Sequence, residues 1–96
     1  MIRSFGNRLT EDLFFNRASA SAARFPTILR ERTRRKLHYM NAATGLRDLQ
    51  SPPGNRLERL EGRYSGYWSI RINDQWRITF RVDAGEFEEV AIVDYH

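Results

Sequence analysis

The chain has 96 residues, 41% of them hydrophobic and 12% aromatic, and a formal net charge of +4. This length fits one compact domain, and this hydrophobic content excludes a disordered segment. The sequence contains no cysteine, which excludes both disulfides and thiolate metal sites.

The N-terminal residues predict a short strand over 2–5. They lack the apolar core of a signal peptide, and no apolar run in the sequence approaches the length needed to span a membrane. We therefore expect a cytoplasmic protein that makes no membrane contact.

A first short helix is predicted by apolar residues at helical spacing. Thr10 is its expected N-cap, because Glu11 and Asp12 follow it in the first turn, where the helix dipole favours negative charge. The helix is expected to end near Arg17. The small residues 19–23 then favour a loop.

A longer helix is predicted to follow, with Pro26 in its first turn and Met40 near its end. Residues 44–49 can add one further helical turn. The segment 51–55, Ser-Pro-Pro-Gly-Asn, excludes both helix and central strand, because two prolines and a glycine interrupt either structure.

After residue 55 the hydrophobic period changes from about 3.6 to 2, which predicts strands. The expected strands cover residues 56–60, 67–72, 76–82 and 87–95. Helices followed by an antiparallel meander predict an α+β domain, in which two N-terminal helices pack on a C-terminal antiparallel β-sheet.

The central hairpin needs a loop of three residues. A two-residue turn would place the apolar rows of the two strands on opposite faces, because a slip of one residue exchanges the faces of a strand. A loop at 73–75 instead pairs Ile70 with Ile78 on the core face. Trp68 and Trp76 belong to the same row, so we expect them to be structural.

On the other face this register places Arg71 directly opposite Arg77. Like charges across a strand pair are unfavourable, by about 0.2–1 kcal/mol. Two guanidinium groups converging on one anion could instead stabilise developing charge, which predicts a phosphate site. The alternative is that Glu58, Glu61 or Asp94 from a neighbouring strand neutralises the pair.

The chain ends in Asp94, Tyr95 and His96, three groups able to exchange protons or donate and accept hydrogen bonds. If the last strand joins the same sheet, they finish beside the arginine pair. A lone terminal histidine is more often an inert residue, and this alternative stays open at this point.

Positive charge is concentrated in the first part of the chain. Residues 1–56 hold 11 basic and 4 acidic side chains, a net of +7, whereas 57–96 hold 5 and 8, a net of −3. Such a field suits a polyanion such as RNA, and it suits an acidic protein nearly as well. The candidate RNA contacts are Arg34, Arg35, Lys36, Arg56, Arg59 and Arg63.

Several segments together resemble the HigB-like branch of the RelE/ParE toxin superfamily. They are residues 57–62, residues 66–80 with W-S-I and W-R-I-T-F, and the ending D-Y-H at 94–96. Segments 51–58 and 73–77 look closest to the GraT toxins within that branch. The likeness extends through most of the chain.

The resemblance implies a RelE-like microbial ribonuclease fold that cleaves messenger RNA in the ribosomal A site without a metal or cofactor. It also implies a HigA-like helix-turn-helix antitoxin as partner. In such enzymes a ribose 2′-hydroxyl attacks the adjacent phosphate. Carried over, Arg71 and Arg77 would stabilise the phosphorane, Tyr95 and His96 would transfer protons, and Asp94 would orient one of them.

The chain departs from this family where better-known members carry L-H-P-L-K-G. Glu58 and Glu61 replace the histidine and the lysine of that motif. Either glutamate could act as general base, but two acids also repel RNA phosphate, so we expect modest cleavage. Arg59 and Arg63 could compensate as phosphate contacts. The alternatives are a ParE-like toxin that inhibits a protein target by binding, and a degenerate protein-binding module.

Overall fold

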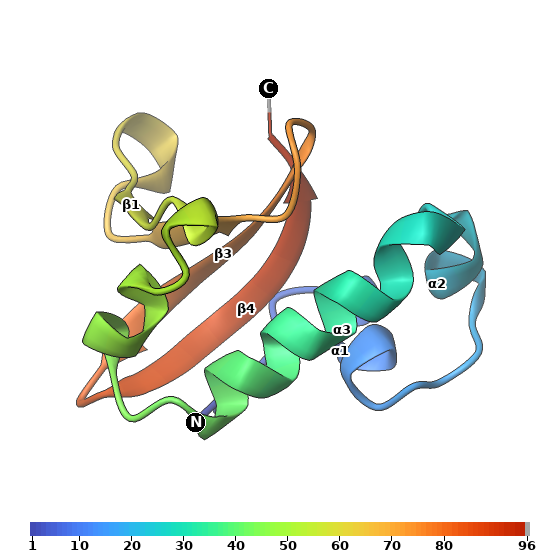
Figure 1. Cartoon of the computed structure of the whole chain (residues 1–96), viewed down its shortest axis with the longest axis horizontal. Helices are drawn as coiled ribbons and strands as arrows, with labels where there is room; N and C mark the ends of the chain where they lie inside the picture. Colours follow the sequence, from blue (N-terminus) through green and yellow to red (C-terminus); the bar gives the residue numbers. More distant parts are fainter. Residues whose placement is uncertain (96) are drawn as a thin grey trace.

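Four antiparallel strands form one sheet in the order β1-β2-β3-β4, and the helices pack against one face of it (Figure 1). A computed structural model describes residues 1–95. The helices are α1 (Arg8–Phe14), α2 (Ala20–Arg24) and α3 (Thr27–Ala42), and none of these is long and apolar enough to cross a membrane. The strands are β1 (Glu58–Arg59), β2 (Trp68–Arg71), β3 (Trp76–Asp83) and β4 (Glu86–Asp94). Short 3₁₀ turns cover Leu46–Gln50, Pro53–Asn55 and Gly62–Tyr64.

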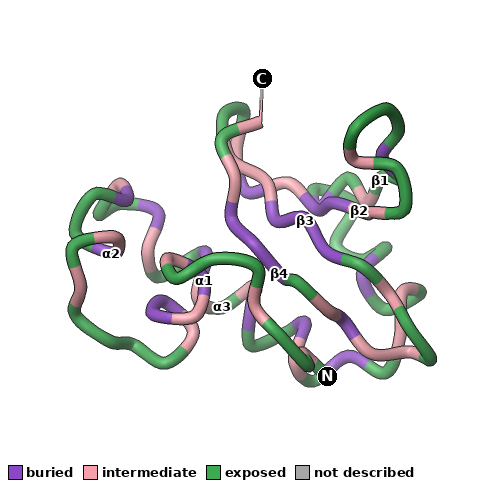
Figure 2. The backbone as a smooth tube through the Cα atoms, turned by 180° about the vertical axis from the view of Figure 1, so that it is seen from behind, coloured by how far each residue is buried: buried purple, intermediate pink, exposed green. Residues whose placement is uncertain are grey.

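The core lies between the helices and the inner face of the sheet (Figure 2). Ile70 and Ile78 face each other across β2 and β3 and are fully buried, together with Leu37 of α3. Trp68 and Trp76 pack against this core from its edge. The α+β architecture and the structural role of both tryptophans are therefore confirmed.

The hairpin register is the predicted one. Ile70 pairs with Ile78 and Arg71 with Arg77, and Ile72 donates its amide proton to the Trp76 carbonyl oxygen at 2.9 Å. The loop of three residues therefore puts both apolar rows on the buried face and both arginines on the other.

The start of α1 differs from the prediction. Asn7, not Thr10, is the N-cap, and its side-chain oxygen accepts from the Thr10 amide at 3.1 Å. Thr10 is fully buried, and its hydroxyl accepts from the Ile92 amide of β4 at 2.7 Å. The threonine thus joins the helix to the sheet, a long-range role that local sequence does not indicate.

Two other segments are more helical than predicted. Residues 19–23, expected as a loop, mostly belong to the five-residue helix α2, which Ser19 caps by accepting from the Ala22 amide at 3.0 Å. The segment 51–55 contains the 3₁₀ turn Pro53–Asn55, because a proline is tolerated in a first turn.

The predicted first and second strands are shorter than expected. Residues 2–5 make only two isolated parallel bridges to β4, at Phe87 and Val90. A bulge separates these bridges, with Glu89 at a positive φ of 53°, and a bulge interrupts a regular ladder. The strand over 56–60 shortens to β1, and Arg56 cannot belong to it because its backbone is left-handed, with φ 45° and ψ 57°.

The Thr10 hydroxyl generates a test of stability. Thr10→Val keeps the side-chain shape but leaves the buried Ile92 amide without its acceptor. We expect the free energy of unfolding to fall by about 1–3 kcal/mol in urea denaturation. Thr33→Val is the matched control, because Thr33 is equally buried and its hydroxyl has no hydrogen-bond partner within residues 1–95. Equal stability of the two variants would contradict the role given to Thr10.

Candidate functional site

The outer face of the β2–β3 hairpin presents Arg77 in a fixed position. Its Nε donates to the Ser69 hydroxyl at 2.9 Å, and a terminal nitrogen donates to the Arg56 carbonyl oxygen at 2.8 Å. The other terminal nitrogen lies 3.7 Å from a carboxylate oxygen of Glu58, and the side chain is only 11% exposed. Three contacts therefore hold the guanidinium group before any ligand arrives.

Arg71 has a different partner from its neighbour. Its guanidinium group pairs with Asp74 in the hairpin loop, and this hydrogen bond lowers the pKa of the Asp74 carboxyl. The two arginines are thus adjacent along the sheet, but each is paired with its own carboxylate. Of the three acids considered as neutralising partners, Glu58 occupies that position, beside Arg77.

The end of β4 brings Tyr95 over this face. The Tyr95 ring centroid lies 5.8 Å from the Arg77 guanidinium carbon and 6.2 Å from the ring of Tyr64. The Tyr95 amide donates to the Gln75 carbonyl oxygen at 2.9 Å, which ties the chain end to the hairpin loop. The aromatic ring therefore covers one side of the fixed arginine.

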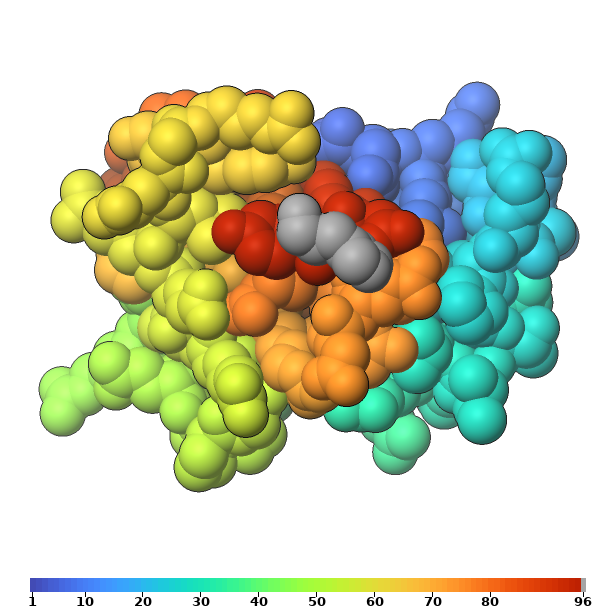
Figure 3. Space-filling model, turned by 90° about the horizontal axis from the view of Figure 1, so that it is seen from above, coloured from blue at the N-terminus to red at the C-terminus, as the bar shows by residue number. Residues whose placement is uncertain are grey.

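Asp94 and His96 flank Tyr95. Asp94 pairs with Trp76 at the edge of the ladder and accepts from the Gln75 side-chain amide at 3.0 Å. His96 lies outside the described residues. In the space-filling view the C-terminal residues, in red, lie between the segment after β1, in yellow, and the hairpin, in orange (Figure 3).

The two glutamates occupy different positions. Glu58 lies on β1 opposite Ser69, next to Arg77, whereas Glu61 is exposed at the start of the turn Gly62–Tyr64. Within residues 1–95 no ion pair joins Glu61 to either hairpin arginine. Geometry therefore distinguishes the two acids, which the sequence alone did not.

The candidate RNA-binding residues divide into two groups. Arg59 and Arg63 are exposed on and after β1, and the Arg63 guanidinium carbon lies 5.3 Å from the Tyr64 ring centroid. On α3, Arg34 pairs with Glu31 at 3.0 Å, so its charge is partly neutralised. Arg35 and Lys36 lie on the part of α3 that meets the 51–55 segment, and Arg56 follows that segment.

Four contributors to the site were not expected from the sequence. Ser69 and the Arg56 carbonyl hold Arg77, and Tyr64 packs beside Tyr95. Asn55 is the fourth: it is 3% exposed, and its amide donates to the carbonyl oxygens of Leu49 and Ser51 at 3.3 Å. Only Ser69 carried a signal, since its alternation places it on the same strand face as Arg71.

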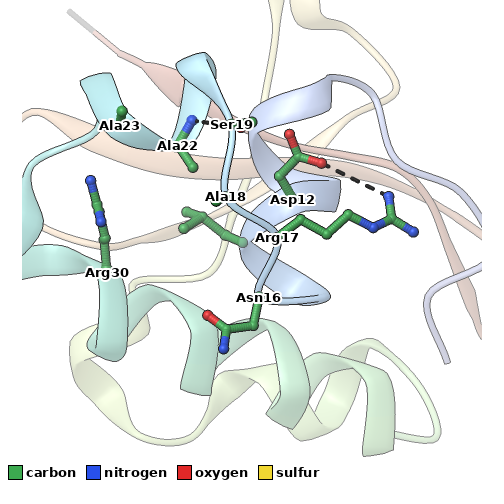
Figure 4. Close-up of a pocket in the computed structure, with 9 residues that line it drawn as sticks. Asp12, Asn16, Arg17, Ala18, Ser19, Ala22, Ala23 and Arg30 are labelled. Atoms are coloured by element: carbon green, nitrogen blue, oxygen red, sulfur yellow. Dashed lines mark hydrogen bonds and ion pairs between the residues drawn. The ribbon is translucent and has the colours of Figure 1, made fainter.

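A hollow of about 250 Å³ lies away from this face, between α1, α2 and α3 (Figure 4). Asp12 projects into it from α1, 3.8 Å from Arg17, and Arg30 comes from α3 on the opposite wall. A buried carboxylate disfavours phosphate, so this hollow does not extend the cationic face. Within residues 1–95 no three acidic or histidine side chains cluster to hold a metal ion.

Comparison with known proteins gives matches of different extent. Residues 5–96 match the family model of the RelE-like toxin of type II toxin-antitoxin system HigB. The chain is 30% identical to Endoribonuclease HigB of Proteus vulgaris over 96 residues, all of both chains. It is 51% identical to Toxin HigB-1 of Vibrio cholerae over 47 residues, which are 49% of this chain and half of that protein's length.

Solved structures show the same fold. The chain superposes on a chain of the YoeB-YefM complex from Staphylococcus aureus with a TM-score of 0.59. The alignment covers all of this chain and 98% of the other at 16% identity. With the family match over residues 5–96, the chain belongs to the HigB-like family of RelE-like toxins of type II toxin–antitoxin systems.

Proposed function

We propose that the protein is an endoribonuclease that cleaves messenger RNA on the ribosome. The observation that carries the proposal is Arg77, held by Ser69 and the Arg56 carbonyl and covered by Tyr95. A guanidinium group positioned before substrate binds can stabilise charge that develops in the transition state. The full-length similarity to a protein named Endoribonuclease HigB supports the same chemistry.

The reaction needs no group from outside the chain. The ribose 2′-oxygen forms a bond to the adjacent phosphorus, the bond from phosphorus to the 5′-oxygen breaks, and a 2′,3′-cyclic phosphate and a 5′-hydroxyl result. Arg77 and Arg71 face the extra negative charge on the phosphorane. Tyr95 and His96 transfer the protons, and Asp94 and Gln75 hold the chain end. No step uses a metal or cofactor.

Lys36 adds a third positive charge close to the hairpin. Its ammonium group donates to the Asn55 side chain at 2.6 Å. Burial lowers the pKa of Lys36, and the positive charges of Arg32 and Arg71 lower it further. Lys36, Arg32 and Arg71 therefore share one positive field beside the hairpin. Such a field gains most from a polyanion, which would relieve the repulsion.

The proposed partners are the ribosome with its messenger and a HigA-like helix-turn-helix antitoxin, in the cytoplasm where ribosomes work. Arg34, Arg35, Arg59 and Arg63 supply the remaining basic surface for ribosomal RNA. An antitoxin partner is supported by the fold neighbour, which was solved as a toxin–antitoxin complex.

A second candidate is a toxin that acts by binding a protein target. The pairing of Arg77 with Glu58 and of Arg71 with Asp74 favours it, because both hairpin cations already have a carboxylate beside them. Growth inhibition by a chain that leaves ribosome-bound messenger intact would establish this second function.

The first prediction from the proposed function concerns Arg77. With purified ribosomes and messenger, Arg77→Gln should lower the rate of cleavage about 100- to 1000-fold, as for the loss of one fixed oxyanion donor. Arg81→Gln is the matched control, since Arg81 lies on the same strand, is half exposed and pairs with Glu89 at 3.9 Å. Thermal unfolding of both variants checks that they fold. A normal rate for Arg77→Gln would reject the proposed site.

The second prediction concerns Glu58. Its carboxylate competes with RNA phosphate for Arg77, so Glu58→Gln should lower the KM for messenger about 1.5- to 5-fold, the range of an exposed ion pair. Glu61→Gln should change KM less, because Glu61 does not pair with Arg77. A fall in kcat in Glu58→Gln would identify Glu58 as the general base instead.

The third prediction is a titration of Lys36, the only lysine in the chain. Its pKa, followed by NMR of the reductively methylated amine, should lie below the ordinary value of 10.5. A positive neighbour destabilises the ammonium form, so Arg71→Gln should raise this pKa and Arg63→Gln should not. An unchanged Lys36 pKa in Arg71→Gln would show that the two cations do not share a field.

A further inference from the structure

An apolar slot opens beside the cationic face, between α3 and the edge of β2. Its volume is about 220 Å³, and nearly all of its exposed lining is apolar. Since β1 pairs only with Trp68 and Ser69, no strand within residues 1–95 covers the β2 edge at Ile70. The slot is lined by Arg35, Lys36, Tyr39, Pro52, Asn55 and Ile70.

The lining of the slot combines an aromatic ring and a proline with two cationic side chains. Tyr39 is 49% exposed, and Pro52 lines the slot with it. Ile70 forms the floor and is 1% exposed. Arg35 and Lys36 also line the slot, and the aliphatic stems of such side chains can cover apolar surface.

One short loop joins the slot to the arginine site. Asn55 holds Lys36 on the side of the slot, and the next residue, Arg56, gives its carbonyl oxygen to Arg77 on the other side. A strand of RNA with its phosphate at Arg77 therefore needs to cross only this loop to reach the slot. The positive charge of Arg71 also acts on Lys36.

We propose that the slot binds one base of the messenger strand, next to the phosphate that is cleaved. The inference rests on the proposed function and adds a specific subsite to it. Single-stranded RNA is bound by aromatic surfaces that stack on bases, bordered by cations that contact the backbone. The slot combines both features. Its volume is below the roughly 300–1,000 Å³ of pockets for drug-sized ligands, which suits a single flat ring system.

Tyr39 is the residue that this subsite depends on most. Its hydroxyl lies 3.4 Å from the Asp48 carbonyl oxygen, so the ring is oriented by a backbone group outside the slot. A stacked base gains contact with the ring face whatever its hydrogen-bonding edge. The slot therefore adds affinity for RNA while tolerating different bases.

The test uses ribosomes programmed with a messenger that carries 2-aminopurine beside the cleavage position. Stacking quenches the fluorescence of this base. The wild-type protein should quench it, Tyr39→Phe should retain most of the quenching, and Tyr39→Leu should lose it. Tyr39→Leu should also raise KM about 5- to 100-fold, the range of one base–aromatic stack, with a much smaller change in kcat.

Phe15→Leu is the matched control, because Phe15 is another half-exposed ring, at the end of α1, and it should leave both readouts at wild-type values. Undiminished quenching and KM in Tyr39→Leu would overturn the proposal. So would loss of antitoxin binding in Tyr39→Leu with normal RNA readouts, which would assign the slot to a protein side chain.

The fluorescence separates the slot from the reaction. If the wild type quenches the base but never cleaves the messenger, the proposed nuclease fails and the slot stands. If the wild type cleaves without quenching, the slot fails and the nuclease stands.

Discussion

The pairing of Ile70 with Ile78 is the constraint on which the rest of the sheet depends. Both side chains are fully buried beneath the helices, and burying two such chains contributes about 3–6 kcal/mol. A shift of one residue would expose one apolar row and bury arginine in its place. Hydrophobic burial thus keeps Arg71 and Arg77 side by side on the opposite face, although their mutual repulsion opposes that arrangement.

The structure reduces this repulsion by giving each arginine its own carboxylate. Asp74 forms an ion pair with Arg71, and Glu58 lies near Arg77. Both carboxylates are more than half exposed. Exposed ion pairs contribute only about 0–1 kcal/mol, so a phosphate can replace such a carboxylate at small cost. The neutral hydrogen bonds of Arg77 to Ser69 and to the Arg56 carbonyl do not compete with the substrate in this way. The neutral contacts therefore hold Arg77 in place, whereas the carboxylates beside the two arginines can be replaced by a phosphate.

Elements with a strong local pattern could be predicted from the sequence. The α+β class, the long helix and the hairpin register follow from periodicity and loop length, and all three are confirmed. The roles of Thr10 and Asn55 could not be predicted, because each bonds to backbone groups that only tertiary packing brings within reach. The bulge at Glu89 is of the same kind, since its positive φ has no local signal in a glutamate.

The functional site, like the fold, could be predicted only where the local pattern was strong. Strand alternation was sufficient to place Arg71 opposite Arg77, but not to show that Asp74 in the loop would fold back on one of them. The family pattern drew attention to Glu58 and Glu61 equally, whereas only Glu58 lies on a strand beside an arginine.

The role of Asn55 could not be predicted from the sequence. It looks like a turn residue after two prolines, yet it is buried and holds Lys36 at one surface of its loop, while the next carbonyl holds Arg77 at the other. Through this loop, the position of α3 and the position of the fixed arginine depend on each other.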